Sequence, residues 1–154
     1  MAIETERKYL LKNDNWKQNS TPVLIRQGYL FTSENSAMRV RIQGEKAFIN
    51  IKSSKNGLTR LEYEYAVPTD DANEILDKLC HQPLIVKNRY IVNYCGKKWE
   101  IDEFLDENEG LVVAEIELKA ENEEFEKPEW IGEEVTFEKR YYNSQLTAHP
   151  YKKW

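Results

Sequence analysis

The sequence contains few of the residues that build thiolate or imidazole metal centres. It has two cysteines, Cys80 and Cys95, and two histidines, His81 and His149, in 154 residues. Neither pair has the spacing of a metal site, and an intracellular protein would keep both cysteines reduced. Any bound metal is therefore expected to have oxygen ligands, which suits Mg²⁺ or Mn²⁺.

Long apolar segments are also missing. No run approaches the ~18 residues that a membrane-spanning helix needs, and the first residues lack the apolar core of a signal peptide. There is no internal repeat, low-complexity segment or Pro/Gly-rich linker. We therefore expect a single cytoplasmic domain over residues 1–154, with no membrane partner.

Positive charge is not in excess. The 22 Lys and Arg residues are outnumbered by 27 Asp and Glu residues, which gives a net charge of −5. A nucleic-acid binder normally has a basic balance, so we expect no nucleic-acid partner. The composition still permits a local basic pocket for a small anion.

Strand patterns dominate the chain. Alternating apolar and polar residues, separated by turn signals such as Cys95-Gly96, predict eight strands. The predicted strands cover residues 2–10, 23–31, 37–43, 46–52, 58–67, 84–94, 97–104 and 110–119. Sequential strands usually pair, and eight antiparallel strands can close on themselves. The expected fold is mainly β (α+β), an eight-stranded antiparallel β-barrel or tunnel with a few flanking helices.

Helical patterns are confined to a few short segments. Apolar residues spaced three and four apart predict an amphipathic helix over 70–80. We expect an acidic helical turn at 121–125, a loop at 128–132 and a short closing helix at about 138–147.

The first predicted strand carries the sequence Glu4-Thr5-Glu6-Arg7-Lys8. Alternate residues of a strand share a face, so Glu4, Glu6 and Lys8 stand side by side. Two neighbouring carboxylates repel each other unless a positive group lies between them, and a divalent cation is the usual solution. A lysine one step further can bind an anion held by that cation. The pattern favours a metal-assisted site for a phosphorylated substrate.

Other strands repeat this arrangement of charges on one face and apolar residues on the other. The charged pairs are Arg39 and Arg41, Glu62 and Glu64, Lys87 and Arg89, Glu100 and Asp102, and Glu115 and Glu117, and Lys52 shares a face with Asn50. A solvated sheet face is the simpler explanation for any one strand. Like charges on neighbouring positions cost energy, however, so their sorting by strand favours an interior that positions opposite ligands. Acids outnumber bases in this set, so such an interior would need cations to bind a polyanion.

In this order, the motifs resemble those of the triphosphate tunnel metalloenzymes, also called CYTH-domain proteins. Glu4-Thr5-Glu6-Arg7-Lys8 looks like their E-x-E-x-K signature. The resemblance continues through Met38–Arg41, Asn50–Lys52, Glu62–Tyr65, Lys87–Tyr90, Trp99–Phe104, Ala114–Glu117, Trp130–Thr136 and Arg140–Asn143. It is greatest with the compact bacterial members. It implies an eight-stranded antiparallel tunnel that binds a triphosphate along its length and uses Mg²⁺ or Mn²⁺.

Site roles follow from the resemblance and from the chemistry of the side chains. Glu4 and Glu6 are expected to bind the metal, with Glu117 as a third ligand and Glu115 as a weaker candidate. Six basic residues are expected to hold phosphate oxygens, with salt bridges to interior acids as the alternative for each: Lys8, Arg39, Arg41, Lys52, Lys87 and Arg89.

The remaining acids have two alternative roles. Glu62 and Glu64, which with Lys8 are the candidate catalytic residues, and Glu100 and Asp102 could each hold a second metal and its water or orient the basic side chains. Metal-activated water would attack the terminal phosphorus in line. Tyr29 is expected to be a packed aromatic rather than a pocket residue, and Trp99 and Trp130 are expected in the outer packing.

The resemblance leaves several activities open. Inorganic tripolyphosphate is the expected substrate, with nucleoside triphosphates as possible further ones, because no inserted segment suggests a base-binding pocket. Thiamine triphosphatase or class IV adenylyl cyclase activity is the alternative. A polyphosphate-binding module without catalysis and a structural sandwich with solvated faces are the non-enzymatic alternatives. The protein could be a monomer or a homodimer.

Overall fold

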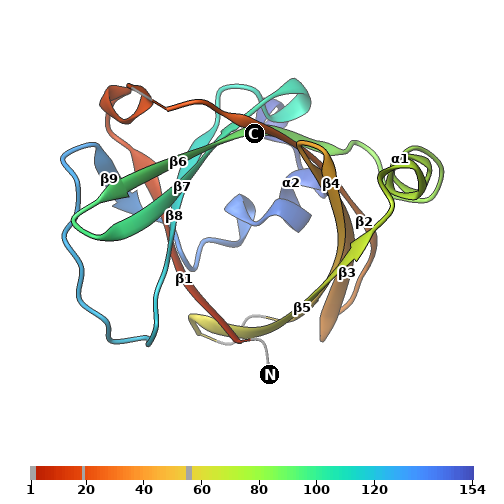
Figure 1. Cartoon of the computed structure of the whole chain (residues 1–154), viewed down its shortest axis with the longest axis horizontal. Helices are drawn as coiled ribbons and strands as arrows, with labels where there is room; N and C mark the ends of the chain where they lie inside the picture. Colours follow the sequence, from red (N-terminus) through yellow and green to blue (C-terminus); the bar gives the residue numbers. More distant parts are fainter. Residues whose placement is uncertain (1–2, 19, 55–56) are drawn as a thin grey trace.

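A computed structural model describes residues 3–18, 20–54 and 57–154, and its strands form a closed ring (Figure 1). The wall consists of β1 (Ile3–Leu11), β2 (Val23–Thr32), β3 (Ser36–Gln43), β4 (Lys46–Ser53), β5 (Thr59–Val67), β6 (Ile85–Tyr94), β7 (Lys97–Phe104) and β8 (Val112–Glu117). They are antiparallel in the order β5-β4-β3-β2-β6-β7-β8-β1, and β1 pairs again with β5. The predicted eight-stranded antiparallel barrel is confirmed; residue 2 of its first strand lies outside the described residues.

The seam that closes the barrel between β1 and β5 is short. It pairs Ile3 with Leu61, Glu4 with Arg60 and Thr5 with Thr59. The hydroxyl oxygens of Thr5 and Thr59 are 2.9 Å apart and share a hydrogen bond. Beyond this point β1 continues along β8, with which it pairs from Glu6 to Leu10.

A ninth strand lies outside the ring. β9 (Ile131–Glu134) pairs with β1 at Tyr9 and Leu11, on the edge that β5 no longer covers. The predicted loop at 128–132 is therefore wrong from residue 131 onward. The unpaired backbone groups of β1 provide a ready partner for an extended segment, which the local sequence alone does not reveal.

Most apolar side chains of the strands face away from the barrel axis. On β1, β7 and β8, Tyr9, Trp99 and Ile116 belong to an outer cluster that also contains Trp16 and Trp130. The expected outer packing of Trp99 and Trp130 is confirmed, and their rings lie edge to face with centroids 5.8 Å apart. The alternate positions of each strand, which are mostly polar, therefore point into the interior of the barrel.

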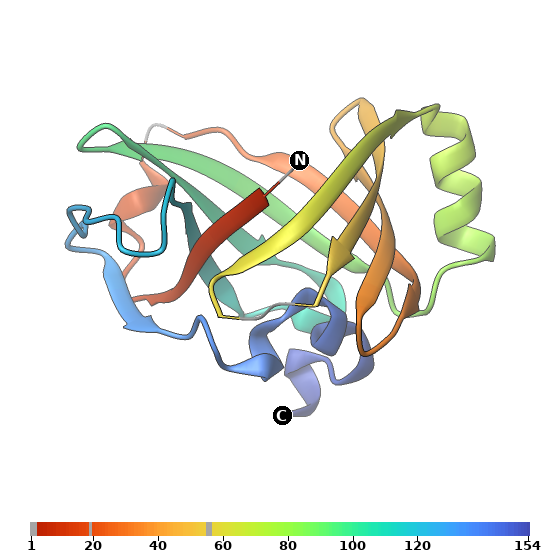
Figure 2. The same ribbon diagram turned by 90° about the horizontal axis from the view of Figure 1, so that it is seen from below.

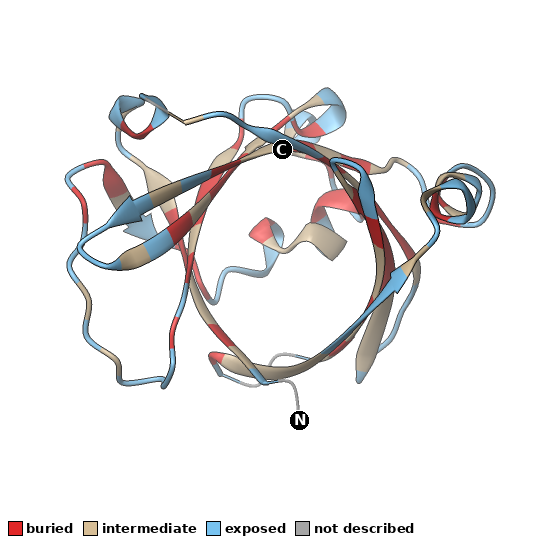
Figure 3. Cartoon of the chain, viewed as in Figure 1, coloured by how far each residue is buried: buried red, intermediate tan, exposed pale blue. Residues whose placement is uncertain are grey.

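The helix α1 (Thr69–Lys78) covers a second outer cluster. Ala72 and Leu76 of α1 pack onto Val40 and Ile42 of β3 and Ala47 of β4. The predicted helix over 70–80 is confirmed, although it ends two residues earlier. Figure 3 shows buried and intermediate residues around the ring, while much of α1 is exposed.

The C-terminal segment lies across one end of the barrel (Figure 2). A 3-10 turn (Lys139–Tyr141) leads into α2 (Asn143–Ala148), and a second turn follows at Tyr151–Lys153. Leu146 of α2 is fully buried in a cluster with Ile85 and Phe104, which come from the inner face of the wall. The predicted closing helix at 138–147 is thus present as a turn followed by a shorter α-helix.

The acidic helical turn predicted at 121–125 is wrong. Residues 123–128 have no regular secondary structure, and Phe125 lies edge to face against both Tyr9 and Trp99. Burial of this aromatic ring on the outer cluster outweighs the weak local preference of an acidic stretch for a helix. No helix in the described part of the chain is long and apolar enough to cross a membrane.

We predict that Leu76→Ala lowers the free energy of unfolding by about 2–5 kcal/mol, because Leu76 is fully buried between α1 and the barrel. Leu79→Ala, at the end of the same helix, is the matched control because Leu79 is 66% exposed. It should change the free energy of unfolding by less than about 0.5 kcal/mol. Urea unfolding followed by circular dichroism measures both, and equal effects would contradict this packing of α1.

Candidate active site

The barrel encloses a cavity of about 960 Å³. Its wall brings together most of the charged residues singled out in the sequence, from seven of the eight strands. They are Glu4, Glu6, Lys8, Arg39, Arg41, Lys52, Glu62, Glu64, Arg89, Glu100, Glu115 and Glu117. The alternation of strand side chains accounts for this gathering, since the charged positions of each strand share the inner face.

Lys87 and Asp102 lie beneath the cavity wall. Both are 1% exposed and neither lines the cavity. Lys87 Nζ is 2.8 Å from Asp102 Oδ2. Burial is the main cause that lowers the pKa of Lys87 to about 8, with a further contribution from the like charge of Arg89.

Arg89 is held by two acids. Its guanidinium donates to both carboxylate oxygens of Asp102, at 2.8 and 2.9 Å, and to Glu100 at 2.8 Å. Burial by itself would raise the pKa of Asp102, but Arg89 and Lys87 together lower it to about 2. Asp102 therefore stays ionised at neutral pH and fixes the plane of Arg89 through a bidentate pair.

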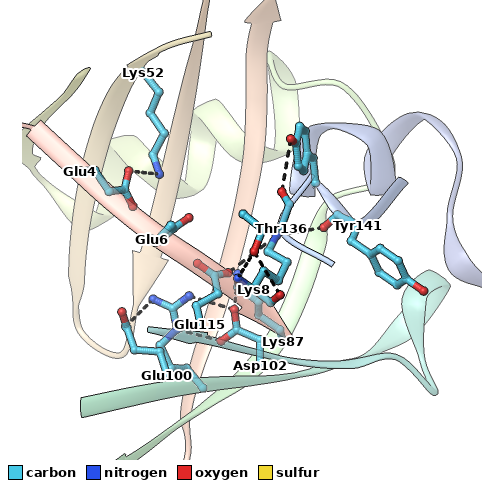
Figure 4. Close-up of polar contacts among 12 residues, drawn as sticks. Glu4, Glu6, Lys8, Lys52, Lys87, Glu100, Asp102, Glu115, Thr136 and Tyr141 are labelled. Atoms are coloured by element: carbon cyan, nitrogen blue, oxygen red, sulfur yellow. Dashed lines mark hydrogen bonds and ion pairs between the residues drawn. The ribbon is translucent and has the colours of Figure 1, made fainter. Parts of the chain in front are cut away.

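The signature residues of β1 face acids and bases from other strands (Figure 4). Lys8 Nζ is 3.8 Å from Glu115 Oε1 and donates a hydrogen bond of 3.1 Å to the carbonyl oxygen of Tyr141. Burial opposes the charge of Glu115, but Lys8 is the first of the groups that hold the pKa of Glu115 well below its usual range. Lys8 thus connects β1 to β8 and to the C-terminal segment.

Glu6 lies between two other carboxyl groups. Burial, then the negative charges of Glu115 and Glu4, raise its pKa well above the usual range. The contact with Glu115 raises the pKa of Glu6 further. A buried cluster of carboxyl groups is a place where a cation can offset the negative charge.

Glu4 is surrounded by positive groups. Its Oε2 atom is 3.3 Å from Lys52 Nζ and 3.3 Å from Arg60 Nε. Burial raises the pKa of Glu4, but a hydrogen bond with Glu62 and the charges of Lys52 and Arg60 outweigh it, so the pKa lies far below the usual range. Lys52 also approaches Glu62, at 3.3 Å.

Two more arginines complete the wall. Arg41 donates to Glu64 at 2.9 Å, and Arg39 donates to the amide oxygen of Asn50 at 3.4 Å. Burial and the neighbouring charge of Arg39 lower the pKa of Arg41. The barrel therefore holds the positive charges of Arg39 and Arg41 close together. Their combined potential attracts an anion into the cavity.

Sequence reasoning missed some residues of the site. Arg60 lines the cavity, and its position two residues before Glu62 could have revealed it by strand alternation. Lys139, Tyr142, Asn143 and Ser144 also line the cavity but come from the C-terminal segment, where strand alternation gives no signal. Tyr29 is buried, as expected for a packed aromatic, and it also lines the cavity, which was the alternative.

The acidic side chains fit a divalent ion in their chemistry. Glu4, Glu6, Glu115 and Glu117 all face the cavity and offer the oxygen donors that hard cations prefer. In the described residues no three of these groups are arranged around one point, and Glu4, Glu6 and Glu115 instead pair with Lys52, Arg60 and Lys8. The pKa of Glu6 is raised by burial and by the negative charges of Glu115 and Glu4, which a cation at this place would offset.

Comparison with known proteins agrees with this architecture. Residues 2–150 match the family described as the CYTH domain. The chain is 49% identical over 152 residues to an inorganic triphosphatase of Acetivibrio thermocellus, covering 99% of this chain and 97% of that protein. It is 35% identical over 148 residues to an inorganic triphosphatase of Nitrosomonas europaea, covering 93% and 95%.

A solved structure shares the fold over a similar extent. The crystal structure of an inorganic triphosphatase superposes with a TM-score of 0.69 at 31% identity, over 96% of this chain and 95% of that chain. The match across almost the entire sequence, together with these identities, shows that the chain belongs to the CYTH-domain family.

Proposed function

We propose that this protein is an inorganic triphosphatase that hydrolyses tripolyphosphate inside its barrel. The observation that carries this proposal is the single cavity in which Glu4, Glu6 and Lys8 face basic side chains from four other strands. An elongated polyanion needs positive groups on several sides, which a closed barrel provides and an open sheet does not. Both relatives named above are inorganic triphosphatases, which supports the same activity here. One continuous barrel also supports a single domain over residues 1–154.

The phosphate chain would be held by the basic residues that reach the cavity. These are Lys8, Arg39, Arg41, Lys52 and Arg89, all predicted from the sequence, and Arg60 and Lys139 in addition. The arginines can bind phosphate oxygens bidentately, whereas the lysines act as point charges. Lys87 has no access to the cavity in this conformation, and its position supports a role in holding Asp102 and thereby Arg89.

CYTH triphosphatases are generally dependent on divalent metal ions. We propose that Glu4, Glu6, Glu115 and Glu117 hold Mg²⁺ or Mn²⁺. When bound there, such an ion would supply charge neutralisation and water activation. The basic residues around the substrate would stabilise the leaving pyrophosphate while water attacks the terminal phosphorus in line.

The remaining acids would orient the basic groups. Glu62 contacts Lys52 and Glu64 contacts Arg41, while Glu100 and Asp102 hold Arg89. Fixing these long side chains in advance lowers the entropy lost when the substrate binds. We therefore assign these four acids to positioning rather than to a second ion.

Phosphate release tests the proposed substrate. We expect rapid release from tripolyphosphate with Mg²⁺ or Mn²⁺, slower or no release from ATP and thiamine triphosphate, and loss of activity in EDTA that either ion restores. The reason is that the cavity recognises phosphate charge and needs a cation to offset its acids. Colorimetric phosphate assays with chromatography of the products measure this. Cyclic AMP and pyrophosphate from ATP would overturn the hydrolase assignment, and tight tripolyphosphate binding without release would favour a binding module.

We predict that Glu4→Gln and Glu6→Gln each lower kcat for tripolyphosphate by at least about 100-fold, because each removes a carboxylate from the ion site. Glu133→Gln is the control, since Glu133 is an exposed acid of β9 outside the cavity, and it should leave kcat within about twofold. Steady-state kinetics at saturating Mn²⁺ measure kcat for the three variants and the wild type. Unchanged activity in both cavity variants would show that the ion site lies elsewhere.

Asp102→Asn should reveal a pH-dependent contribution to stability. The pKa of Asp102 is about 2 in the folded protein and about 3.9 in an unfolded chain, so its ionised form stabilises the fold above about pH 4. That contribution is lost as the pH falls through about 2. At pH 6 the variant should be less stable by about 3 kcal/mol, because Lys87 and Arg89 lose their buried partner.

The difference between wild type and Asp102→Asn should therefore narrow between pH 4 and pH 2.5, as measured by urea unfolding. Asp77→Asn is the control, since Asp77 pairs with Arg26 on the surface and is 63% exposed. Its effect should stay within about 0.5 kcal/mol at every pH. A difference for Asp102→Asn that does not change with pH would contradict the buried ion pair.

A further inference from the structure

Arg60 lies on β5 at the seam that closes the barrel. It pairs in register with Glu4 across the short contact between β1 and β5. Its Nε atom is 3.3 Å from Glu4 Oε2, and its Nη2 atom is 3.6 Å from Glu6 Oε1. One guanidinium thus bridges the two carboxylates of the β1 signature.

The two carboxylates depend on Arg60 to different degrees. Glu4 is also approached by Lys52, but Lys52 is shared with Glu62 at the same distance of 3.3 Å. Among the described residues, Arg60 is the one ion-pair partner of Glu6, which otherwise faces Glu4 and Glu115. The guanidinium is 23% exposed, so it is mostly removed from water but still reaches the cavity.

We propose that Arg60 is a displaceable counter-cation for Glu4 and Glu6: its guanidinium neutralises them in the ion-free protein and leaves both when a divalent ion binds there. This inference rests on the proposed role of these two residues as ion ligands. An arginine cannot lose its proton at any physiological pH, so it must move rather than become neutral. Separating it from two carboxylates costs energy that the ion must supply, so Arg60 weakens ion binding.

Ion affinity measured without substrate tests this exchange. Arg60→Gln should bind Mn²⁺ about tenfold more tightly than wild type in isothermal titration calorimetry, because no guanidinium has to be displaced. Arg41→Gln is the matched control, because it also removes one positive charge from the cavity. The ion pair that it breaks is with Glu64 rather than with Glu4 or Glu6. Its Mn²⁺ affinity should change by less than about threefold, the effect of a more distant charge.

A second readout is the melting temperature. The ion-free Arg60→Gln variant should melt below wild type, because Glu4 and Glu6 lose their neutralising partner, and saturating Mn²⁺ should raise its melting temperature by more than it raises that of wild type. If Arg60→Gln does not fold, Arg60→Lys carries the test. The ammonium of a lysine is a point charge on a shorter side chain and lacks the fixed fork of the guanidinium, so it should hold the two carboxylates less well, and we expect Mn²⁺ binding a few-fold tighter than wild type.

Three results would overturn the proposal. They are Mn²⁺ binding to Arg60→Gln that is no tighter than to wild type, equal gains in Arg60→Gln and Arg41→Gln, or no Mn²⁺ binding by wild type. None of these measurements uses substrate. Failure of the counter-cation is therefore distinguishable from failure of the triphosphatase assignment, which phosphate release from tripolyphosphate tests separately.

Discussion

Ion pairs fill the interior of this barrel, where most folded domains hold apolar side chains. A buried charge without a partner is costly, so each acid and base must find its opposite across the cavity. Arg89 between Asp102 and Glu100, Lys52 between Glu4 and Glu62, and Arg41 against Glu64 satisfy this demand. These partners come from different strands, so they are all in place only when the barrel is closed.

The rest of the architecture follows from this interior. Because the inner face is polar, the hydrophobic stabilisation of the fold must come from the outer face, which needs covering elements. The helix α1 covers β3 and β4, and the segment that carries Phe125 and Trp130 covers Trp99. The end of the barrel near Phe104 is closed by Leu146 of α2. The helix α1, the segment that carries Phe125 and Trp130, and α2 therefore each cover apolar surface of the barrel.

The same balance of charge prepares the cavity for its ligands. Acids hold the arginine and lysine side chains in place at the cavity wall, so these side chains are already oriented when an anion binds. The bases in turn keep carboxylates ionised, as the low pKa of Glu115 beside Lys8 shows. At Glu6 the neighbouring bases do not offset burial and the negative charges of Glu115 and Glu4, so the pKa of Glu6 rises well above its usual range. A cation is the natural remedy for these negative charges.

The sequence by itself determined the strands, the inner face of each strand and the identity of most cavity residues, because alternation along a strand is a local property. It also fixed the family through the order of its charged motifs. Only the tertiary structure decided what depends on contacts between distant segments. The segment around Phe125 is not helical because Phe125 packs on Trp99, β9 forms because β1 has a free edge, and Lys87 is held beneath the cavity by its ion pair with Asp102. The bridge from Arg60 to Glu4 and Glu6 likewise exists only once the barrel has closed at its seam.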